Sequence, residues 1–274
     1  MKKVIIIGAG GKLGTEITSV IQGSNFQIET NHYGGKPDAI IICTSVLTDN
    51  HIENILKYGV PVVSMTTDDA RNILKNKLEE HRIPYIIDVN HALPIIDFFD
   101  KLEQLPSHIV SRIDVSVTES HQQGKKDPSG SLNRICMTLQ SKGNNLIWNL
   151  EKAKDSYDCN ESNGYGSCTW IRHPRTQMKC YGISEKFLSG HAFHHIRIDG
   201  PIQDVDNLYI FFSSLNDYSM PNIFSIHVVK KNKGLEIEFC VFGRAIYGNG
   251  AVLAMNHLLN GGDSGDMVTV LKNL

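Results

Sequence analysis

The chain has 274 residues, of which 20% are charged and 41% are hydrophobic, and its formal net charge is -2. This length allows one or two domains with a sizeable core, and the balanced charge gives no overall basic field for nucleic acid or for a membrane surface. No apolar run reaches the length of about 20 residues that a membrane-spanning helix needs.

A cytoplasmic location is expected, because a buried strand predicted from Val4 leaves no room for a signal peptide. The six cysteines form no Cys-x-x-Cys pair, and we expect them to be reduced thiols. Some of them share one region with histidines: Cys159, Cys168, Cys180, His191, His194 and His195. Their spacings fit no common zinc pattern, so we expect no metal site there.

The N-terminal segment has the pattern of a dinucleotide-binding turn. Residues 4–7 are a continuous β-branched run, which predicts a strand buried on both faces. The glycines that follow allow a tight turn, close approach of the backbone to a pyrophosphate, and a helix that starts at that anion. The residues of this cofactor loop are Gly8, Gly10, Gly11, Lys12, Leu13 and Gly14. The alternative is a glycine-rich turn in an unrelated α/β protein.

A second predicted strand, residues 26–29, ends in Glu29, about 20 residues after Gly8, where an acid could bind a ribose 2′-hydroxyl. Alternation then continues with predicted strands at 38–43, 60–65 and 83–89 and predicted helices at 15–21, 49–58, 68–81 and 93–105. This order predicts a Rossmann-type doubly wound parallel sheet. Loops after its strands would meet at the ligand edge, which adds Thr44 to the predicted cofactor residues.

Beyond residue 105 the pattern changes to that of an α+β domain. Residues 112–118 alternate apolar and polar side chains, which suits a strand with one exposed face. Further strands are predicted at 208–213, 224–230 and 235–242, in a mixed or antiparallel sheet. We expect a dinucleotide-binding domain of residues 1–92 and 243–274, and a substrate-binding and oligomerisation domain of residues 93–242.

Residues 119–131, Glu-Ser-His-Gln-Gln-Gly-Lys-Lys-Asp-Pro-Ser-Gly-Ser, combine an imidazole, two ammonium groups and a Ser-Gly-Ser turn. We call this stretch the signature loop. Such a segment can hold an anionic substrate and supply a proton. A lone histidine at a strand end often has no catalytic or binding role. His121 and Lys125 occur together with the Ser-Gly-Ser turn, and such a combination of groups favours a functional site.

Three stretches resemble the dihydrodipicolinate reductase family. Residues 8–14 look like its cofactor loop, and the signature loop is similar to its Glu-Ala-His-His-x-x-Lys-x-Asp-Ala-Pro-Ser-Gly-Thr motif. Residues 243–251, Gly-Arg-Ala-Ile-Tyr-Gly-Asn-Gly-Ala, resemble its Ser-Arg-x-x-Phe-Ala-x-Gly-Ala run, and Asn90 matches the Asn of its Ala-Pro-Asn-Phe-Ser segment. The resemblance covers residues 1–135 and 222–260.

The resemblance implies an NADH- or NADPH-dependent reductase of the diaminopimelate-lysine pathway, which reduces an unsaturated cyclic imine-type dicarboxylate. It implies His121 as the proton donor, or the group that orients one, and Lys125 as a general acid and carboxylate clamp. Four more residues would bind substrate: Gln122, Ser129, Gly130 and Ser131. The resemblance also implies that Thr66, Thr67 and Asn90 contribute to the cofactor site. Glu29 favours NADH with NADPH tolerated, since no arginine follows it. The family also buries exposed sheet faces between subunits, which implies a homo-oligomer, most simply a tetramer.

The chain departs from the family at several positions. The paired histidine is replaced by His121-Gln122, the alanine before Pro128 is absent, and the Gly-Thr-Thr-Gly loop reads Met-Thr-Thr-Asp at residues 65–68. An insertion lies within residues 137–221. Two alternatives therefore stay open: a divergent paralogue that reduces another imine or enamine acid, and a nucleotide-binding sensor that has lost catalysis.

Overall fold

The computed structural model describes residues 1–29, 36–44, 46–66, 70–121, 129–147, 167–172 and 192–274. The chain divides into two compact units. The first unit comprises Met1–Ile96 and Arg244–Leu274, and the second comprises Asp97–Gly243. In the described part of the chain, no helix combines the length and the apolar character needed to cross a membrane.

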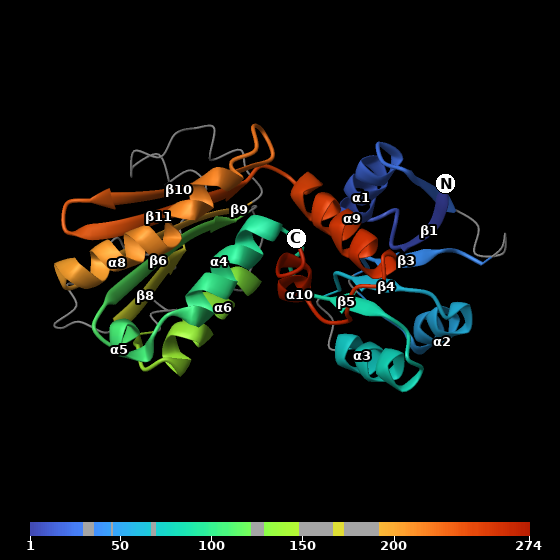
Figure 1. Cartoon of the computed structure of the whole chain (residues 1–274), viewed down its shortest axis with the longest axis horizontal. Helices are drawn as coiled ribbons and strands as arrows, with labels where there is room; N and C mark the ends of the chain where they lie inside the picture. The colour runs from blue at the N-terminus through green and yellow to red at the C-terminus, as the bar shows by residue number, and fades with distance from the viewer. Residues whose placement is uncertain (30–35, 45, 67–69, 122–128, 148–166, 173–191) are drawn as a thin grey trace. The chain divides into compact units, whose positions relative to one another are not determined.

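The first unit is built on a five-stranded parallel sheet with the order β2-β1-β3-β4-β5 (Figure 1). Its strands are β1 (Lys2–Ile7), β2 (Phe26–Glu29), β3 (Ala39–Ile42), β4 (Val62–Ser64) and β5 (Tyr85–Ile87). β3 is fully buried along its length, as its run of apolar residues predicts for a central parallel strand. The predicted Rossmann-type sheet is confirmed.

Helices cover both faces of this sheet. The helix α1 (Lys12–Gln22) and the long C-terminal helix α9 (Ala245–Leu259) lie side by side on one face, with α10 (Met267–Leu271) nearby (Figure 1). On the other face are α2 (Asp49–Tyr58) and α3 (Ala70–Glu80). The contact between α1 and α9 is close, because a Cβ atom on Gly248 would lie 2.9 Å from the Val20 side chain. The C-terminal segment is therefore part of the core of the first unit.

The start of α9 also packs against the segment that follows β5. A Cβ atom at Gly250 would lie 1.6 Å from the carbonyl oxygen of His91, so only glycine fits there. The His91 side chain is fully buried, and neither of its ring nitrogens has a hydrogen-bond partner among the described residues. Burial lowers the pKa of His91 from 6.5 to about 3, because the charged imidazolium would lose its water.

His91 is expected to make the first unit sensitive to acid. Its pKa is lower in the folded state than in the unfolded state, so the unfolded state binds more protons between about pH 6.5 and pH 3. The free energy of unfolding should fall with falling pH in that window, by up to about 1.4 kcal/mol per pH unit from this group. Denaturant unfolding from pH 7 to pH 4 would measure it. His91→Phe should flatten the slope, and His108→Phe, at an exposed site, should not; equal slopes in all three proteins would contradict the assignment.

The second unit contains a six-stranded mixed sheet with the order β10-β11-β9-β6-β8-β7. Its strands are β6 (Asp114–His121), β7 (Asn145–Ile147), β8 (Ser167–Arg172), β9 (Ala192–Asp199), β10 (Phe224–Lys231) and β11 (Gly234–Val241). The pairs from β10 to β6 are antiparallel, whereas β8 pairs in parallel with both β6 and β7. The predicted mixed sheet is confirmed.

Helices cover one face of this second sheet (Figure 1). They are α4 (Leu93–Gln104), α5 (Ser107–Val110), α6 (Gly130–Ser141) and α8 (Ile202–Phe212), with the 3-10 helix η3 (Ser213–Tyr218) after α8. The core between α4, α8 and β11 is aromatic, with the Phe98 ring centroid 5.8 Å from those of Phe212 and Phe239. We call this the helix-covered face, and the opposite side the outer face.

One predicted strand is wrong. Residues 208–213 were predicted as a strand, but 208–212 form the last part of α8. Val205, Leu208 and Phe212 are buried and recur at helical spacing, whereas the side chain of Ile210 is 71% exposed. The short run Leu-Tyr-Ile-Phe-Phe is rich in strand-forming residues, and such runs do not distinguish a helix from a strand. The strands β7, β8 and β9 were not predicted.

Candidate functional site

The glycine turn after β1 adopts a geometry that two of its glycines require. Gly8 has a positive φ of 92°, and a Cβ atom there would lie 2.9 Å from the backbone nitrogen of Thr44. A Cβ atom at Gly14 would lie 2.0 Å from the carbonyl oxygen of Gly8. A hydrogen bond of 3.0 Å from the amide of Gly11 to the same oxygen closes the turn. Gly8 and Gly14 are therefore fixed by the packing of the turn itself.

Gly10 is different, because a Cβ atom there would meet no described atom within 4 Å. The turn leads directly into α1, whose N-cap residue Gly11 makes no side-chain cap. The first amides of a helix point outward and carry a partial positive charge, which suits a phosphate group. Open space at Gly10 beside uncapped helix amides fits a pyrophosphate, and these are the residues that would hold it.

The other predicted cofactor residues in the described part of the chain follow the strands of the same sheet. Thr44 follows β3, and its hydroxyl donates to the Val46 carbonyl at 3.0 Å. Thr66 follows β4 and is buried. Asn90 follows β5, and its side-chain oxygen accepts a hydrogen bond of 2.8 Å from the Ala92 amide. Because carboxyl ends of parallel strands share one edge, these residues lie along the edge that carries the glycine turn.

Glu29 ends β2, at the edge of the sheet, and pairs in register with Ile5 of β1. Its carboxylate forms an ion pair of 3.5 Å with the ammonium group of Lys3. Both side chains are partly exposed, so the ion pair is weak and leaves the carboxylate open to a further partner. Thr67, a further predicted cofactor residue, lies outside the described residues.

The structure describes the two ends of the signature loop. Glu119 and His121 belong to β6, where His121 pairs in register with Ala192 of β9. At the other end, Ser129 is the N-cap of α6, and its hydroxyl accepts a hydrogen bond of 3.0 Å from the Leu132 amide. Gly130 and Ser131 form the first turn of that helix. Gln122 and Lys125 lie outside the described residues.

The two described ends of the loop meet in a buried cluster that sequence reasoning missed. Glu119, Ser129 and His194 of β9 are each at most 3% exposed. The His194 Nε2 atom lies 3.1 Å from the Ser129 hydroxyl and 3.3 Å from the Glu119 Oε2 atom. The amide of Ser129 also donates to the Glu119 Oε1 atom at 3.4 Å. This cluster ties the end of β6 to the start of α6.

The geometry of the cluster points to positioning rather than to nucleophilic catalysis. Both Ser129 and Glu119 contact the same nitrogen of His194, whereas a proton relay of the serine-hydrolase type uses both ring nitrogens. The His194 ring also stacks on Phe239, with centroids 4.6 Å apart. Leaving a buried hydrogen-bonding group without its partner costs about 1–3 kcal/mol, so this arrangement holds the loop ends firmly. From sequence, His194 could have been placed on this face only through the alternation of side chains along β9. That strand was not predicted.

The residues 243–251 that resemble the family's C-terminal run lead into α9. Gly243 has a positive φ of 142°, and Gly250 is the residue that packs on the His91 backbone. Gly250 therefore serves the fold of the first unit, whereas Gly243 is the last residue of the second unit. The parallel sheet with its glycine turn makes the first unit Rossmann-type, and the second unit carries the signature loop. The chain is therefore a two-unit α/β protein of the Rossmann type.

The comparisons confirm the resemblance to dihydrodipicolinate reductases. The 4-hydroxy-tetrahydrodipicolinate reductase 1, chloroplastic, of Arabidopsis thaliana is 29% identical over 199 residues, which cover 70% of this chain and 52% of that protein. The probable 4-hydroxy-tetrahydrodipicolinate reductase 1, chloroplastic, of Oryza sativa subsp. japonica is 26% identical over 248 residues, or 86% of this chain and 59% of that protein. This chain therefore spans just over half the length of these curated relatives.

A solved structure shows the same fold. The dipicolinate-bound dihydrodipicolinate reductase from Paenisporosarcina sp. TG-14 aligns over 98% of both chains with a TM-score of 0.60 and 14% sequence identity. At this identity the similarity shows the fold and not the activity. No family model matches the chain.

Proposed function

We propose that this protein is a reductase that uses NADH or NADPH to reduce a small cyclic imine or unsaturated dicarboxylate, in the manner of a dihydrodipicolinate reductase in lysine biosynthesis. The observation that carries the proposal is the signature loop, whose ends are tied together by Glu119 and His194 next to the start of α6. The sequence similarity to two reductases of this name supports it.

Different residues of the signature loop would bind the substrate and transfer the proton. Hydride reduction of such a substrate also requires a proton, which His121 or Lys125 would supply, and the ammonium group of Lys125 would hold a carboxylate. The start of α6 would bind a second carboxylate through the amides of Gly130 and Ser131, because a helix N-terminus favours an anion. The Ser129 hydroxyl already caps α6, so its part would be to shape this turn.

The first unit would hold the dinucleotide at the glycine turn, with the pyrophosphate beside Gly10 and the first amides of α1. The nicotinamide, when bound, supplies the hydride. Glu29 at the end of β2 would accept hydrogen bonds from the ribose hydroxyls, which favours NADH over NADPH, because a 2′-phosphate would meet a carboxylate. Lys3 beside Glu29 reduces that repulsion, which agrees with some tolerance for NADPH.

Expression in a lysine auxotroph that lacks the pathway reductase tests the proposal. Growth without added lysine is expected, and it should depend on Lys125. A paralogue that reduces another imine or enamine acid is the second candidate, and Gln122 in place of the family's histidine favours it. Such a paralogue would fail to restore growth but would still oxidise NADH or NADPH with another substrate. A sensor without catalysis would bind the dinucleotide and would turn over no imine acid.

We also propose that the second unit assembles the protein into a homotetramer through its outer face. Ser116, Thr118 and Arg197 lie on that face and are partly exposed, which leaves a sheet surface for another subunit to cover. Thr118→Arg should weaken assembly by placing an unpaired charge in the contact. Ile210→Arg, on the exposed side of α8, should leave it intact. Light scattering at micromolar concentration measures the mass; a monomer of 30.6 kDa for the unmodified chain would contradict this proposal.

A further inference from the structure

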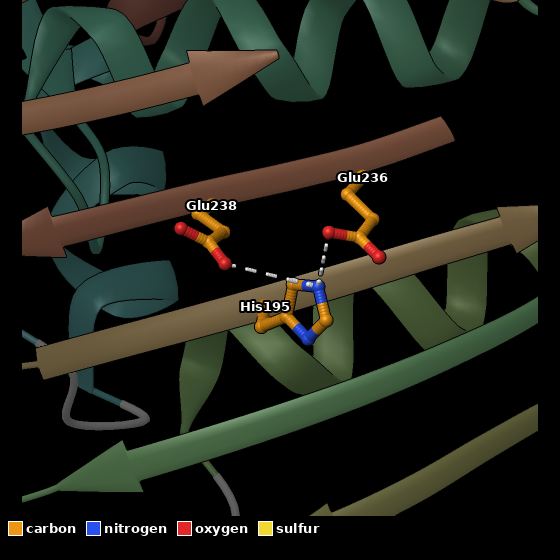
Figure 2. Close-up of side chains that lie close together, drawn as sticks. All are labelled: His195, Glu236 and Glu238. Carbon is orange, nitrogen blue, oxygen red and sulfur yellow. Dashed lines mark ion pairs between the residues drawn. The ribbon is translucent and has the colours of Figure 1, made fainter. Parts of the chain in front are cut away.

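The outer face of the second sheet carries a histidine between two glutamates. His195 of β9 is opposite Glu238 of β11 in the antiparallel register, and Glu236 lies two residues before Glu238 on the same strand. Figure 2 shows the imidazole ring directed toward both carboxylates from the neighbouring strand. The adjacent residue His194 lies on the helix-covered face, since successive side chains of a strand alternate. His195 therefore takes no part in the cluster with Glu119.

The three side chains bring their ligand atoms close together. The Nε2 atom of His195 lies 3.7 Å from Oε2 of Glu236 and 3.9 Å from Oε1 of Glu238. One ligand atom from each residue lies within 4.8 Å of the other two. Because the residues come from paired strands, the sheet hydrogen bonds fix their separation.

The Nε2 atom of His195 is the unusual feature of this group. It is buried, and it has no hydrogen-bond partner among the described residues. Both carboxylates lie beyond hydrogen-bond distance from it. Buried polar atoms in folded proteins nearly always have a partner, so a nitrogen that faces two carboxylates without bonding to either suggests a missing ligand between them.

The surrounding charges leave the group negative. Glu236 contacts Arg197 at 3.5 Å and Lys231 at 3.4 Å, and both separations are long for an ion pair with strong hydrogen bonds. The shortest contact of Arg197, at 2.7 Å, is instead with Asp199. The carboxylates are those of Glu236, Glu238 and Asp199, and the cations are Arg197 and Lys231. One carboxylate charge is therefore left without a cation. His227, opposite Glu238 on β10, is exposed to solvent.

We propose that His195, Glu236 and Glu238 bind a divalent transition-metal ion of the zinc type. One imidazole nitrogen and two carboxylate oxygens suit zinc, whereas magnesium and calcium favour oxygen ligands alone. Ligand atoms around tetrahedral zinc lie about 3.4 Å apart, given bonds of about 2.1 Å, so the side chains need only small rotations to close on the ion. Water would complete the coordination.

All three ligands come from one chain, so the site requires neither a second subunit nor the proposed reductase activity. The ion would connect β9 to β11 in the middle of the outer face. Binding to the folded chain alone stabilises it by mass action, so zinc should raise the unfolding temperature of the protein. The competing explanation for the group is that the three side chains contact only one another, with no ion.

Calorimetric titration of the metal-stripped full-length protein with zinc chloride separates these two explanations. The unmodified chain should bind zinc at this site, and His195→Ala and Glu238→Gln should each lower the affinity by more than about 100-fold, since even residues that only support metal ligands account for about 10–100-fold. His108→Ala and Glu53→Gln, at exposed positions on helices that carry none of the three ligands, are the matched controls and should bind as the unmodified chain does. Unchanged zinc affinity in both site variants would overturn the proposal.

Zinc could also bind to thiols elsewhere in the chain, and cobalt substitution distinguishes that case. Nitrogen and oxygen ligands should give only weak cobalt absorption bands, without the intense thiolate-to-metal charge-transfer band. A thiolate band that is the sole cobalt signal of the unmodified chain and stays unchanged in His195→Ala would also overturn the proposal. If His195→Ala unfolds, Glu238→Gln replaces it, because this variant keeps the shape of the side chain and removes only the charge. Zinc should raise the unfolding temperature of the unmodified chain and leave that of Glu238→Gln unchanged.

Discussion

Lys125→Ala is expected to lower turnover by about 10²–10⁴-fold, the usual loss when a general acid is removed. The ammonium group of Lys125 would otherwise hold a substrate carboxylate and stabilise charge during hydride transfer. The affinity for NADH should barely change, because the signature loop belongs to the second unit and the glycine turn to the first. Steady-state kinetics and cofactor titration by fluorescence measure the two effects separately.

His121→Ala should behave in the same way, and the double variant should lose less than the sum of the two single losses if both groups act on one step. Lys126→Ala, at the neighbouring lysine, is the matched control and should keep most of the activity. Gln122→His restores the family's histidine pair, and it should maintain or raise turnover if the substrate is the lysine precursor. Full turnover in both Lys125→Ala and His121→Ala would show that the catalytic assignment is wrong.

Gly10→Val is expected to abolish tight dinucleotide binding while the protein stays folded. A side chain at Gly10 meets no described atom, so it would extend into the space beside the first amides of α1. Loss of two hydrogen bonds to a charged phosphate, at about 1.5 kcal/mol each, weakens binding by about 100-fold or more. Calorimetry with NADH measures the affinity, and thermal unfolding shows whether the fold is kept.

Gly14→Val is the matched contrast on the same turn. Its side chain would collide with the Gly8 backbone, so we expect the variant to lose more than about 3 kcal/mol of stability in the first unit. Normal NADH affinity in a folded Gly10→Val protein would remove the pyrophosphate from this turn. Normal stability in Gly14→Val would show that the turn has another conformation.

The first unit could be predicted from sequence because its signals are local. For α2 the predicted bounds match the structure. The side chain of Thr48, the N-cap, accepts a hydrogen bond from the His51 amide, and Gly59 ends the helix with a φ of 58°. Both are short-range features of backbone chemistry. The last part of α8 was predicted as a strand because its side chains favour strands locally. Its buried stripe of Val205, Leu208 and Phe212 depends on tertiary packing.

The candidate site was predictable only in part, for the same reason. The signature loop is contiguous in sequence and could be recognised from its residue types. The partner of Glu119 is His194, which lies far along the chain and reaches Glu119 only through the pairing of β6 with β9. The group of His195, Glu236 and Glu238 likewise depends on the register of β9 against β11. Such pairings are absent from local sequence patterns.

Transfer of deuterium from the cofactor to the substrate is a direct test of the proposed reductase activity. The purified protein would be incubated with dihydrodipicolinate precursor formed in situ and with NADH or NADPH that carries deuterium at the transferable position of the nicotinamide. We expect deuterium in the tetrahydrodipicolinate product, at a rate that falls by about 10²–10⁴-fold in Lys125→Ala. Tight dinucleotide binding with no deuterium transferred to this or to any other cyclic imine acid would contradict it.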